Sequence, residues 1–523
     1  MIKQIICFVL IAVLYLNCQS KEQPKQVKKP NILFAISDDQ SFPHAGAYGC
    51  RWVKTPAFDR VAKEGLLFHK AYTPNAKCSP SRACILTGRN SWQLEEAANH
   101  VPFFPEKFKT FTEVLKEHDY YVGRTGKGWA PGVAMLNGQP RELIGKNFME
   151  YKIVPPAEFI SNNDYTKNFE SFLSENKNDL PFFFWYGASE PHRKYEYKAG
   201  VKKGNKQLTD VNHIPEFWPD VDSIRNDMLD YAFEIEHFDK HLSNMLELLE
   251  QRGELDNTIV IVTSDNGMPF PRIKGQIYEY DNHLPLAIMW KNGINDSGRQ
   301  VTDFVNFIDF APTILDAADV EEVNSGMQAI TGSSLYDVFT NSENKNEMQT
   351  DFVLIGKERH DIGRPQDQGY PVRGIVIDSF TYTINFHPER WPAGNPETGY
   401  LNTDGSPTKS YILNENRKGR SKYWDLNFGK RPGEELYNTV IDPYCMNNLA
   451  LNKDFEELKR ALKQQLISAL TKQEDPRILG DGDLFDNYKY AHPETAGFYE
   501  RFIKGEKMNT GWVEDSDFEL QLK

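Results

Sequence analysis

The chain is poor in cysteine and has no excess of basic residues. Cysteine accounts for only 6 of its 523 residues, too few for a fold held together mainly by disulfide bonds. The net charge is −14, from 74 acidic and 60 basic residues. This argues against nucleic acid as a partner, because nucleic-acid-binding proteins usually carry a basic face. A small anionic ligand remains compatible with this charge, since a local pocket can be positive on a negative protein.

The apolar run at the N-terminus is too short for a comfortable membrane span. It covers residues 5–16, whereas a spanning helix needs about 20 apolar residues. Together with Lys3 this run is typical of a signal peptide, which we predict over residues 1–18. Cys18 stands where a bacterial lipoprotein is cleaved and lipidated. We favour lipidation over a plain signal peptide, although Tyr15 and Asn17 match that cleavage pattern only loosely.

Residues 19–30 are polar and rich in lysine, which predicts a linker and not a folded segment. We therefore expect an exported protein of a Gram-negative bacterium, located in the periplasm or on the outer membrane. It would contact the membrane only through its lipid anchor. Export permits disulfide bonds, and four cysteines outside the signal peptide allow at most two: Cys50, Cys78, Cys84 and Cys445.

Between residues 31 and 371, short apolar runs alternate with helical patterns, which is typical of an α/β sheet with helices on both faces. We assign this region to one α/β domain. Apolar runs of strand length predict buried strands at residues 31–37, 181–188, 257–267 and 284–290. Helices are predicted from Pro56 to Gly65, over residues 223–252 and over residues 309–319.

Near residue 372 the pattern changes. Residues 372–386 alternate between apolar and polar side chains, which predicts a hairpin in a half-solvated antiparallel sheet. Residues 454–472 form an amphipathic pattern that predicts a helix covering this sheet. We therefore place a smaller C-terminal subdomain at residues 372–523. The loops at 357–371 and 387–410 are rich in Gly, Pro, Asn and Gln, and such loops often carry specificity.

Two polar sequences come at the ends of predicted strands. Asp38 and Asp39 follow the strand at 31–37, and Asp265 and Asn266 end the strand at 257–267. Ligands of open α/β sheets bind at the carboxyl ends of the strands. Four oxygen-bearing side chains brought together there would suit a hard cation such as Ca²⁺ or Mg²⁺. Either sequence alone is typical of a turn, but their shared position favours a metal site.

Cys78 precedes a Pro-Ser-Arg sequence that opens a predicted helix, with Pro80 in its first turn. A helix N-terminus attracts anions through its free N–H groups and its dipole. Arg82 lies four residues after Cys78, close enough to help hold an anion. A reactive thiolate is one interpretation of Cys78, and a buried, inert cysteine is the other.

Several motifs resemble those of the formylglycine-dependent sulfatases. The sequence CSPSR at 78–82, followed by LTGR at 86–89, is similar to the long and specific motif Cys-x-Pro-Ser-Arg…Leu-Thr-Gly of that family. The resemblance covers nearly the whole mature chain. It is nearest to the heparan N-sulfatase branch, through DNGMPFPR and YPVRGI. The other matching sequences are NILFAISDDQ, GRTGKG, EPHR, SDNG and EELYNTVIDPYCMNNLA.

This resemblance implies an alkaline-phosphatase-like fold and a modified residue. Cys78 would be oxidised by a formylglycine-generating enzyme to formylglycine (3-oxoalanine), whose hydrate supplies the nucleophile that attacks sulfur. Cys84 would then be a core residue of the following helix. One Ca²⁺ ion, with Mg²⁺ as the alternative, would be held by residue 78 together with Asp38, Asp39, Asp265 and Asn266.

The resemblance also implies roles for four cationic or titratable side chains. Arg82 would position formylglycine, and Lys127 would neutralise sulfate charge together with Lys274. His192 would contact the sulfate or protonate the leaving group, since histidine can do either near neutral pH. Taken singly, Lys127 and Lys274 are typical of solvated charges and His192 of a core histidine; their spacing within the matched motifs favours the site.

One position departs from the family pattern. The family usually has Gly-Lys-x-His, whose histidine acts as the base in the elimination step, whereas this chain has Trp129 there. His100 is a candidate replacement because it lies between matched segments. Substrate contacts are predicted for His100 and for three residues near the loop at 357–371, because arginine pairs well with carboxylate or sulfate: Arg359, His360 and Arg373.

We interpret the chain as a sulfatase that acts on a sulfated polysaccharide or its oligosaccharides. Glucosamine N-sulfate in heparan-type chains and sulfate esters of algal polysaccharides such as ulvan are the two candidate substrates. Two alternatives remain. One is a phosphomonoester or phosphodiester hydrolase of the same fold, against which Cys78 counts. The other is a catalytically impaired glycan-binding lipoprotein, which Trp129 makes conceivable.

Overall fold

The computed structural model describes residues 28–340 and 351–519. The predicted signal peptide, Cys18 and most of the predicted linker lie outside the described residues. Within the described ranges, no helix is both long and apolar enough to cross a membrane. The four cysteines of these ranges have free thiols.

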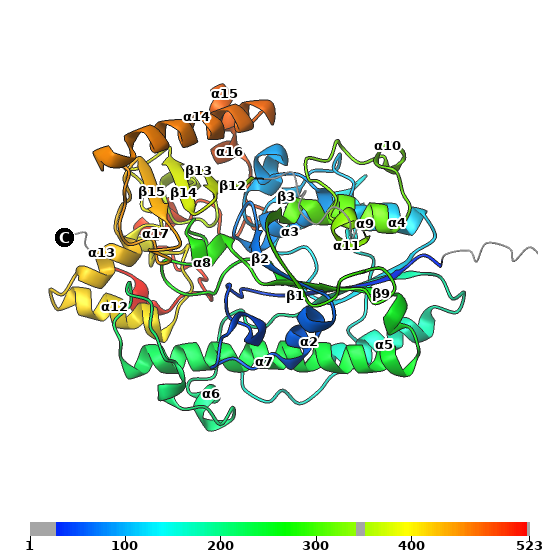
Figure 1. The fold of residues 1–523 in the computed structure, drawn as a ribbon. Coiled ribbons are helices and arrows are strands. Elements are labelled where there is room, and N and C mark those ends of the chain that lie inside the picture. The colour runs from blue at the N-terminus through cyan, green and yellow to red at the C-terminus, as the bar shows by residue number, and fades with distance from the viewer. Residues whose placement is uncertain (1–27, 341–350, 520–523) are drawn as a thin grey trace, which may run out of the picture.

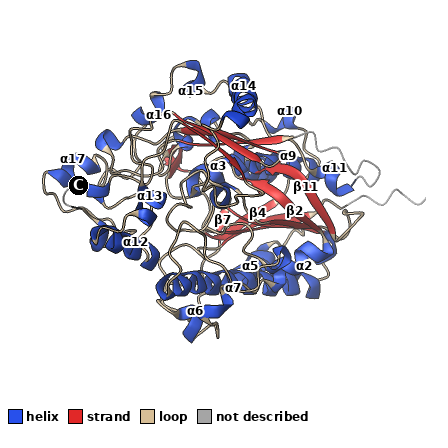
Figure 2. Ribbon diagram, turned by 60° about the vertical axis from the view of Figure 1, so that its left-hand side comes forward, coloured by secondary structure: helices blue, strands red, loops and turns tan. Residues whose placement is uncertain are grey.

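A mixed sheet, drawn in red in Figure 2, lies at the centre of the molecule. It has eight strands in the order β11-β2-β10-β9-β1-β8-β4-β7. Strand β1 is central and pairs in parallel with both β8 and β9, while β10 runs antiparallel to β9 and β2. The α/β sheet and its four predicted strands are confirmed. The strands are β1 (Asn31–Ser37), β2 (Leu66–Tyr72), β4 (Tyr121–Gly126), β7 (Lys146–Asn147), β8 (Phe182–Gly187), β9 (Thr258–Ser264), β10 (Leu286–Met289) and β11 (Arg299–Asn306).

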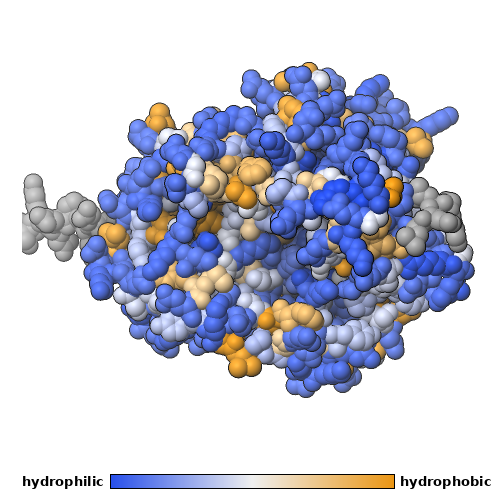
Figure 3. All heavy atoms as spheres, turned by 180° about the vertical axis from the view of Figure 1, so that it is seen from behind, coloured by the Kyte–Doolittle hydropathy of each residue, from blue (hydrophilic) through white to orange (hydrophobic). Residues whose placement is uncertain are grey.

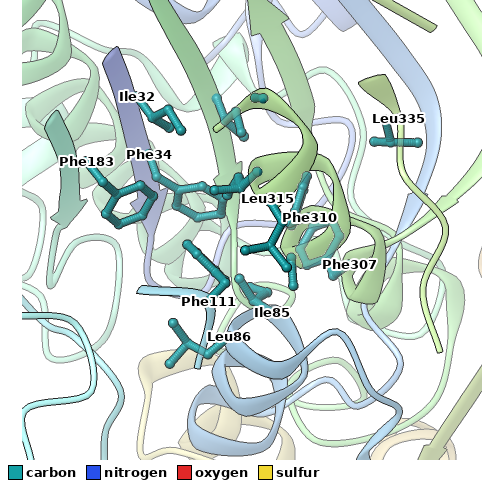
Figure 4. Close-up of a cluster of buried hydrophobic side chains, with 14 of the residues drawn as sticks. Ile32, Phe34, Ile85, Leu86, Phe111, Phe183, Phe307, Phe310, Leu315 and Leu335 are labelled. Atoms are coloured by element: carbon teal, nitrogen blue, oxygen red, sulfur yellow. The ribbon is translucent and has the colours of Figure 1, made fainter. Parts of the chain in front are cut away.

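Helices cover both faces of this sheet, as Figure 1 shows. Successive side chains of a strand point to opposite faces, so β1 serves two cores. Phe34 and its neighbours on one face pack against α3 (Cys78–Thr87), α4 (Phe111–Glu117) and α9 (Phe310–Ala317), a cluster drawn in Figure 4. Leu33 and Ala35 on the other face pack against α2 (Pro56–Glu64), α5 (Tyr165–Glu175) and α7 (Asp222–Gln251).

A second, four-stranded antiparallel sheet lies beside the first. It consists of β12 (Phe352–Lys357), β13 (Val372–Ile377), β14 (Phe380–Asn385) and β15 (Glu434–Asn438). The predicted hairpin is confirmed as β13 and β14, whereas β12 precedes residue 372, where we placed the start of the subdomain. Leu462, Leu466 and Leu470 of the predicted helix, α14 (Glu456–Lys472), cover one face of the small sheet (Figure 1).

The opposite face of the small sheet packs against the large domain. Val353 and Val376 of the small sheet meet Tyr72 and Phe304 of the large one in a shared apolar cluster. A short third sheet contains β3 (Phe103–Phe104), β5 (Val133–Leu136) and β6 (Gln139–Pro140). The remaining α-helices are α6 (Ala199–Lys202), α8 (Glu279–Asn282), α10 (Glu322–Ser325), α11 (Tyr336–Thr340), α12 (Pro407–Arg417), α13 (Lys422–Phe428), α15 (Pro476–Leu479), α16 (Leu484–Asn487) and α17 (Phe498–Ile503).

The face of the molecule drawn in Figure 3 is mainly hydrophilic. On the face seen in Figure 3, apolar side chains lie in small separate groups among hydrophilic ones, around a hollowed centre. Isolated apolar side chains of this kind are ordinary on a soluble domain. An exposed aromatic ring therefore indicates a binding role only where it lines a cavity.

Candidate active site

Parallel pairing brings the two predicted acidic sequences together. Strands β1 and β9 pair in parallel, and their last residues, Ser37 and Ser264, stand side by side. The residues that follow them therefore meet at the carboxyl edge of the sheet. Asp39 adopts a positive φ of 78°, which is costly for a residue other than glycine. Its N–H donates to the Oδ1 atom of Asp265 over 3.1 Å, which holds this conformation.

These side chains form a buried cluster of oxygen ligands. Asp38, Asp39 and Asp265 each offer a carboxylate oxygen within 4.8 Å of the others, and none of the three is more than 2% exposed. The Nδ2 atom of Asn266 donates to Asp39 over 2.7 Å. Its Oδ1 atom is buried and has no hydrogen-bond partner among the described residues. Hard divalent cations prefer carboxylate and amide oxygens, so the donor set fits one such ion.

Cys78 is the first residue of α3 and faces this cluster. Its Sγ atom lies 3.6 Å from the Oδ1 atom of Asp38 and 4.0 Å from the Oδ1 atom of Asp39. The side chain is 1% exposed. Burial raises the pKa of the Cys78 thiol well above its usual range. In the surroundings that the protein alone supplies, this shift favours a neutral thiol over a reactive thiolate at an unmodified Cys78.

Arg82 joins three chain segments one turn further along α3. Its Nε atom donates to the Oδ2 atom of Asp265 over 2.7 Å. Its Nη1 atom donates to the carbonyl oxygens of Lys127 and Gly128 over 3.0 and 2.8 Å. The guanidinium is fully buried. Arg82 thus fixes the loop that carries Lys127 against the end of β9.

Two lysines pair with the carboxylates. The Nζ atom of Lys127 donates to both oxygens of Asp38, over 2.8 and 2.6 Å. Burial alone would raise the pKa of Asp38, but the nearby Lys127 charge lowers it to about 2. The Nζ atom of Lys274 lies 2.7 Å from Asp39 and 2.9 Å from Asp404. Both lysines thus bring positive charge to the cluster of oxygen ligands.

His192 stands at the opening of the cluster. A ring nitrogen of His192 lies within 4.8 Å of both the Cys78 sulfur and an oxygen of Asp38, and its side chain is 33% exposed. Its Nδ1 atom donates to the carbonyl oxygen of Arg193 over 2.7 Å. Because a carbonyl oxygen only accepts, Nδ1 carries a proton and Nε2 faces the cluster. The Nε2 atom is 3.9 Å from the Oδ2 atom of Asp39.

The structure adds Asp404, which our sequence analysis missed. Asp404 lies just before α12, pairs with Lys274 and offers an oxygen within 4.8 Å of both Asp39 and His192. Despite burial, Lys274 holds the pKa of Asp404 well below its usual range. In the sequence this residue belongs to a Thr-Asp-Gly stretch typical of an ordinary turn. No local pattern connects it to a site built from β1 and β9.

A second polar group adjoins the site and contains two of the predicted substrate residues. The Nδ1 atom of His100 lies 3.0 Å from Asp361, which also pairs with Lys77 over 2.8 Å. The Nε2 atom of His100 is buried without a partner among the described residues. His360 bonds to the carbonyl oxygen of Gly275 and to Asn75, over 3.2 and 2.7 Å. Lys77 precedes Cys78 and Gly275 follows Lys274, so this group borders the site.

Within the described residues neither predicted substrate arginine bonds to the carboxylates of the site, although the buried Nε and Nη2 atoms of Arg359 have no hydrogen-bond partner there. Arg373 is fully buried and donates to Asp475 and Glu358, which leaves no group for a sugar. Arg359 is 2% exposed and donates to the carbonyl oxygen of Tyr488. The prediction that Arg373 binds substrate is therefore corrected, since its guanidinium holds the small sheet to a C-terminal segment.

Trp129 occupies the position of the missing histidine as a structural residue. Its Nε1 atom donates to the carbonyl oxygen of Ser79, over 3.0 Å, in the first turn of α3. Its ring meets Phe104 edge to face, with 5.1 Å between the ring centroids. The indole offers no base. Cys84 is fully buried in the core, as expected for a residue of the following helix.

The large mixed sheet ends in buried carboxylates beside the N-terminus of α3 and three cationic side chains, an arrangement that can hold a divalent cation and an anionic group together. The sulfatase family model matches residues 30–320, which is more than half of the chain. The chain therefore belongs to the sulfatase family, whose members hydrolyse sulfuric esters.

Similar proteins share both sequence and fold with this chain. An ulvan-active sulfatase of Formosa agariphila is 24% identical over 533 residues, covering 92% of this chain and 83% of that protein. The human N-sulphoglucosamine sulphohydrolase is 26% identical, covering 86% of this chain and 91% of that enzyme. The structure of BT4656 in complex with its substrate D-glucosamine-2-N,6-O-disulfate aligns with a TM-score of 0.60 and 20% identity, covering 86% and 99% of the two chains.

Proposed function

We propose that this protein removes sulfate groups from a uronic-acid-containing glycan, with formylglycine at position 78 and one bound divalent cation. The observation that carries the proposal is the position of the Cys78 side chain, 3.6 Å from Asp38 and 4.0 Å from Asp39 in a buried oxygen cluster. Membership of the sulfatase family supports the reaction type. The names of the relatives support a sulfated glycan as the substrate.

The charges around Cys78 support a cation and an anionic substrate together. Four carboxylates, those of Asp38, Asp39, Asp265 and Asp404, face three permanent cations, those of Arg82, Lys127 and Lys274. A bound dication would make the group net positive, which favours sulfate. Asp38, Asp39, Asp265 and Asn266 would hold Ca²⁺, with Mg²⁺ as the alternative. Such an ion would stabilise negative charge on the oxygens next to residue 78.

The chemistry proposed for residue 78 requires oxidation of Cys78 by a formylglycine-generating enzyme. A hydroxyl oxygen of the hydrated aldehyde would form a bond to sulfur, while the bond from sulfur to the sugar oxygen or nitrogen breaks. The leaving oxygen or nitrogen of the sugar takes up a proton. His192 would transfer this proton, because it lies at the opening with Nε2 facing the cluster. Loss of the proton of the second hydroxyl then re-forms the aldehyde and releases sulfate.

His100 is our proposed base for that last step in place of the histidine that Trp129 replaces. Asp361 orients its ring through Nδ1, and its Nε2 atom has no partner within the described ranges. Burial lowers the pKa of His100, so its imidazole is neutral at pH 7 and able to accept a proton.

We also propose that the protein is exported and anchored by lipid at Cys18, in the periplasm or on the outer membrane. The N-terminal apolar run and Cys18 support this location. Radiolabelled palmitate incorporation in the expressing bacterium tests it. A Cys18→Ser variant should lose the label, and a wild-type protein that incorporates no label would contradict lipidation.

Sulfate release from defined oligosaccharides tests the function. The protein should be produced together with a formylglycine-generating enzyme, and mass spectrometry should confirm the aldehyde at residue 78. Ion chromatography would then measure free sulfate from heparan-derived and ulvan-derived oligosaccharides, with phosphate esters as a third set. We expect release from one sulfated set and a loss of at least about 1000-fold in Cys78→Ala.

The alternatives make different predictions in the same assay. Release of phosphate alone would identify a phosphoester hydrolase. Binding of oligosaccharides without release of any sulfate, from protein with the aldehyde in place, would contradict the proposed catalytic function. It would favour the catalytically impaired glycan-binding protein.

A further inference from the structure

A cavity of about 400 Å³ opens beside the site and has no role in the proposed chemistry. Arg193 and Gly405 line it, and they directly follow His192 and Asp404 in the chain. His192 and Asp404 lie together at the site, because they offer atoms within 4.8 Å of each other. The residues that directly follow His192 and Asp404 thus place this cavity beside the site. A larger cavity of about 480 Å³, lined by residues such as Asn90 and Gln473, borders none of the site residues.

Exposed aromatic rings form part of the cavity wall. Phe159 is 56% exposed and Tyr197 is 47% exposed, and both line the cavity together with Tyr195. Phe159 has a φ of 73°, a strained conformation for a bulky residue. The backbone thus holds an apolar ring toward water at a cost, which is typical of a residue retained for binding. Aromatic rings offer flat apolar surfaces to ligands that are polar at their edges.

The charged groups of the wall divide into fixed and accessible ones. Asp227 pairs with Arg193 through both oxygens, at 2.7 and 2.9 Å. Asp230 accepts from the backbone N–H groups of Lys198 and Gly200. These carboxylates brace the wall and have their hydrogen bonds satisfied. Lys194, by contrast, is 44% exposed, and its Nζ atom lies 3.3 Å from the equally exposed Glu514. An exposed pair of this kind exchanges partners at little cost.

The hollow continues beyond this pair. A second cavity of about 440 Å³ shares Lys194 and Glu514 with the first and is otherwise lined by residues 508–516. That segment is fastened to the loop of Asp404, because the N–H of Gly405 donates to the carbonyl oxygen of Trp512 over 2.8 Å. The two cavities meet at the Lys194–Glu514 pair, and we refer to them together as the groove.

We propose that this groove binds the sugar residues next to the one that loses its sulfate, and that it selects an anionic oligosaccharide over a monosaccharide. The rings of Phe159 and Tyr197 cover the apolar faces of a pyranose. Lys194 leaves Glu514 to pair with the carboxylate of a uronic acid. This inference rests on the proposed function and names the part of the substrate that lies outside the catalytic cluster.

Binding to catalytically inactive protein tests the groove independently of turnover. Isothermal titration of the Cys78→Ala protein would use heparan-derived and ulvan-derived tetrasaccharides, and the corresponding monosaccharides. We expect a tetrasaccharide of at least one set to bind more tightly than its monosaccharide. Adding Phe159→Ala or Tyr197→Ala should raise the Kd for that tetrasaccharide about tenfold and leave monosaccharide binding unchanged.

Matched variants separate the contributions. Tyr151→Ala removes a ring that is 42% exposed but lines neither cavity, and it should bind like the parent. Lys194→Met should weaken binding of the native tetrasaccharide but not of one whose carboxylates have been reduced to alcohols. Circular dichroism melting of each variant checks that it is folded. The proposal is overturned if no tetrasaccharide outbinds its monosaccharide, or if the groove variants behave like Tyr151→Ala.

Kinetics with the formylglycine-containing enzyme distinguish the two possible failures. Groove variants should raise KM for tetrasaccharides and leave kcat unchanged. If sulfate is released with the same KM by all variants, the groove proposal fails and the function stands. If tetrasaccharides bind in the groove but no sulfate is released, the function fails and the binding site stands.

Discussion

Two of the buried ionic networks among the described residues differ in their balance of charge. The Arg373 cluster joins the small sheet to a C-terminal segment and contains two guanidinium groups and two carboxylates, those of Arg373, Arg477, Glu358 and Asp475. All four carboxylate oxygens accept at least one hydrogen bond. The Cys78 cluster has four carboxylates against three permanent cations: Asp38, Asp39, Asp265 and Asp404 against Arg82, Lys127 and Lys274.

The comparison shows that burial of charge does not by itself indicate a functional site. Both networks are nearly inaccessible to water, yet only the Cys78 cluster keeps an unpartnered buried acceptor, Asn266 Oδ1, and a strained residue, Asp39. Buried polar groups are normally satisfied, so an orphaned acceptor within an excess of carboxylates fits the ligand set of a cation. The balanced network suits a structural role, and the unbalanced one suits the binding of a cation.

The largest expected effect on stability comes from breaking the balanced network. Arg373→Met would leave Asp475 and Glu358 with fewer donors in a buried setting, and should lower the free energy of unfolding by about 3–5 kcal/mol. Chemical denaturation measures this loss. Activity per folded molecule should be retained, because Arg373 contacts no residue of the site. The exposed Arg420 pairs with Glu415, and Arg420→Met should leave the denaturation midpoint almost unchanged. An equal shift in both variants would contradict the structural role of Arg373.

Supplying and removing a divalent cation should act on the unbalanced network alone. At a free Ca²⁺ concentration of about 100 times its Kd, binding should stabilise the protein by about 2.7 kcal/mol, and a chelator should abolish this gain. Asn266→Ala removes the orphaned acceptor and should raise the Kd for Ca²⁺ about tenfold or more. A thermal melt across a Ca²⁺ titration measures both effects. Stabilisation of the wild type and Asn266→Ala at the same Ca²⁺ concentration would place the ion elsewhere.

Asp404→Asn tests the part of the network that sequence analysis missed. Lys274 keeps its bond to Asp39 in this variant and the amide oxygen can replace the carboxylate as its second acceptor, so the loss in free energy of unfolding should be smaller than that of Arg373→Met. Since Lys274 and His192 lose a charged neighbour at the site, kcat/KM for a sulfated oligosaccharide should fall about tenfold, equivalent to about 1.4 kcal/mol. A large loss of stability with unchanged kcat/KM would assign Asp404 to the structural class of Arg373.

The smallest predicted effect concerns a buried imidazole outside both networks. Burial lowers the pKa of His241 on α7 to about 3, whereas the unfolded chain titrates near 6.5. The unfolded state therefore binds the proton first as pH falls. The stability contribution is complete above pH 6.5 and is lost progressively toward pH 3. This costs about 1 kcal/mol at pH 6 relative to pH 8.

Denaturation of His241→Asn at pH 8 and pH 6 measures this contribution. The variant should lose less stability between the two pH values than the wild type. His237 is close to His241, with 4.8 Å between the ring centroids. It is present in both the variant and the wild type, so the difference between their pH dependences is assigned to His241. An unchanged pH dependence would show that His241 does not contribute in this way.

The sequence predicted what is local and missed what depends on distant packing. Strands such as 31–37 are continuous apolar runs, and residues that directly follow them at the sheet edge are fixed by the strand. That is why Asp38 and Asp265 could be predicted together. Asp404 comes from a loop far along the chain, and only tertiary contacts carry it to Lys274. Arg373 was misassigned because an arginine at a loop looks the same in sequence whether a sugar or Asp475 is its partner.

Burial of Cys78 has a consequence for the order of events in the life of the protein. In the folded chain its side chain is 1% exposed, beneath segments that Arg82 fastens together. A second enzyme cannot reach a side chain in that position. If Cys78 is oxidised as proposed, the oxidation must therefore happen while the chain is still unfolded. Once the chain has folded, Cys78 can no longer be oxidised by another enzyme. A molecule that folds before this oxidation therefore remains inactive for as long as it stays folded.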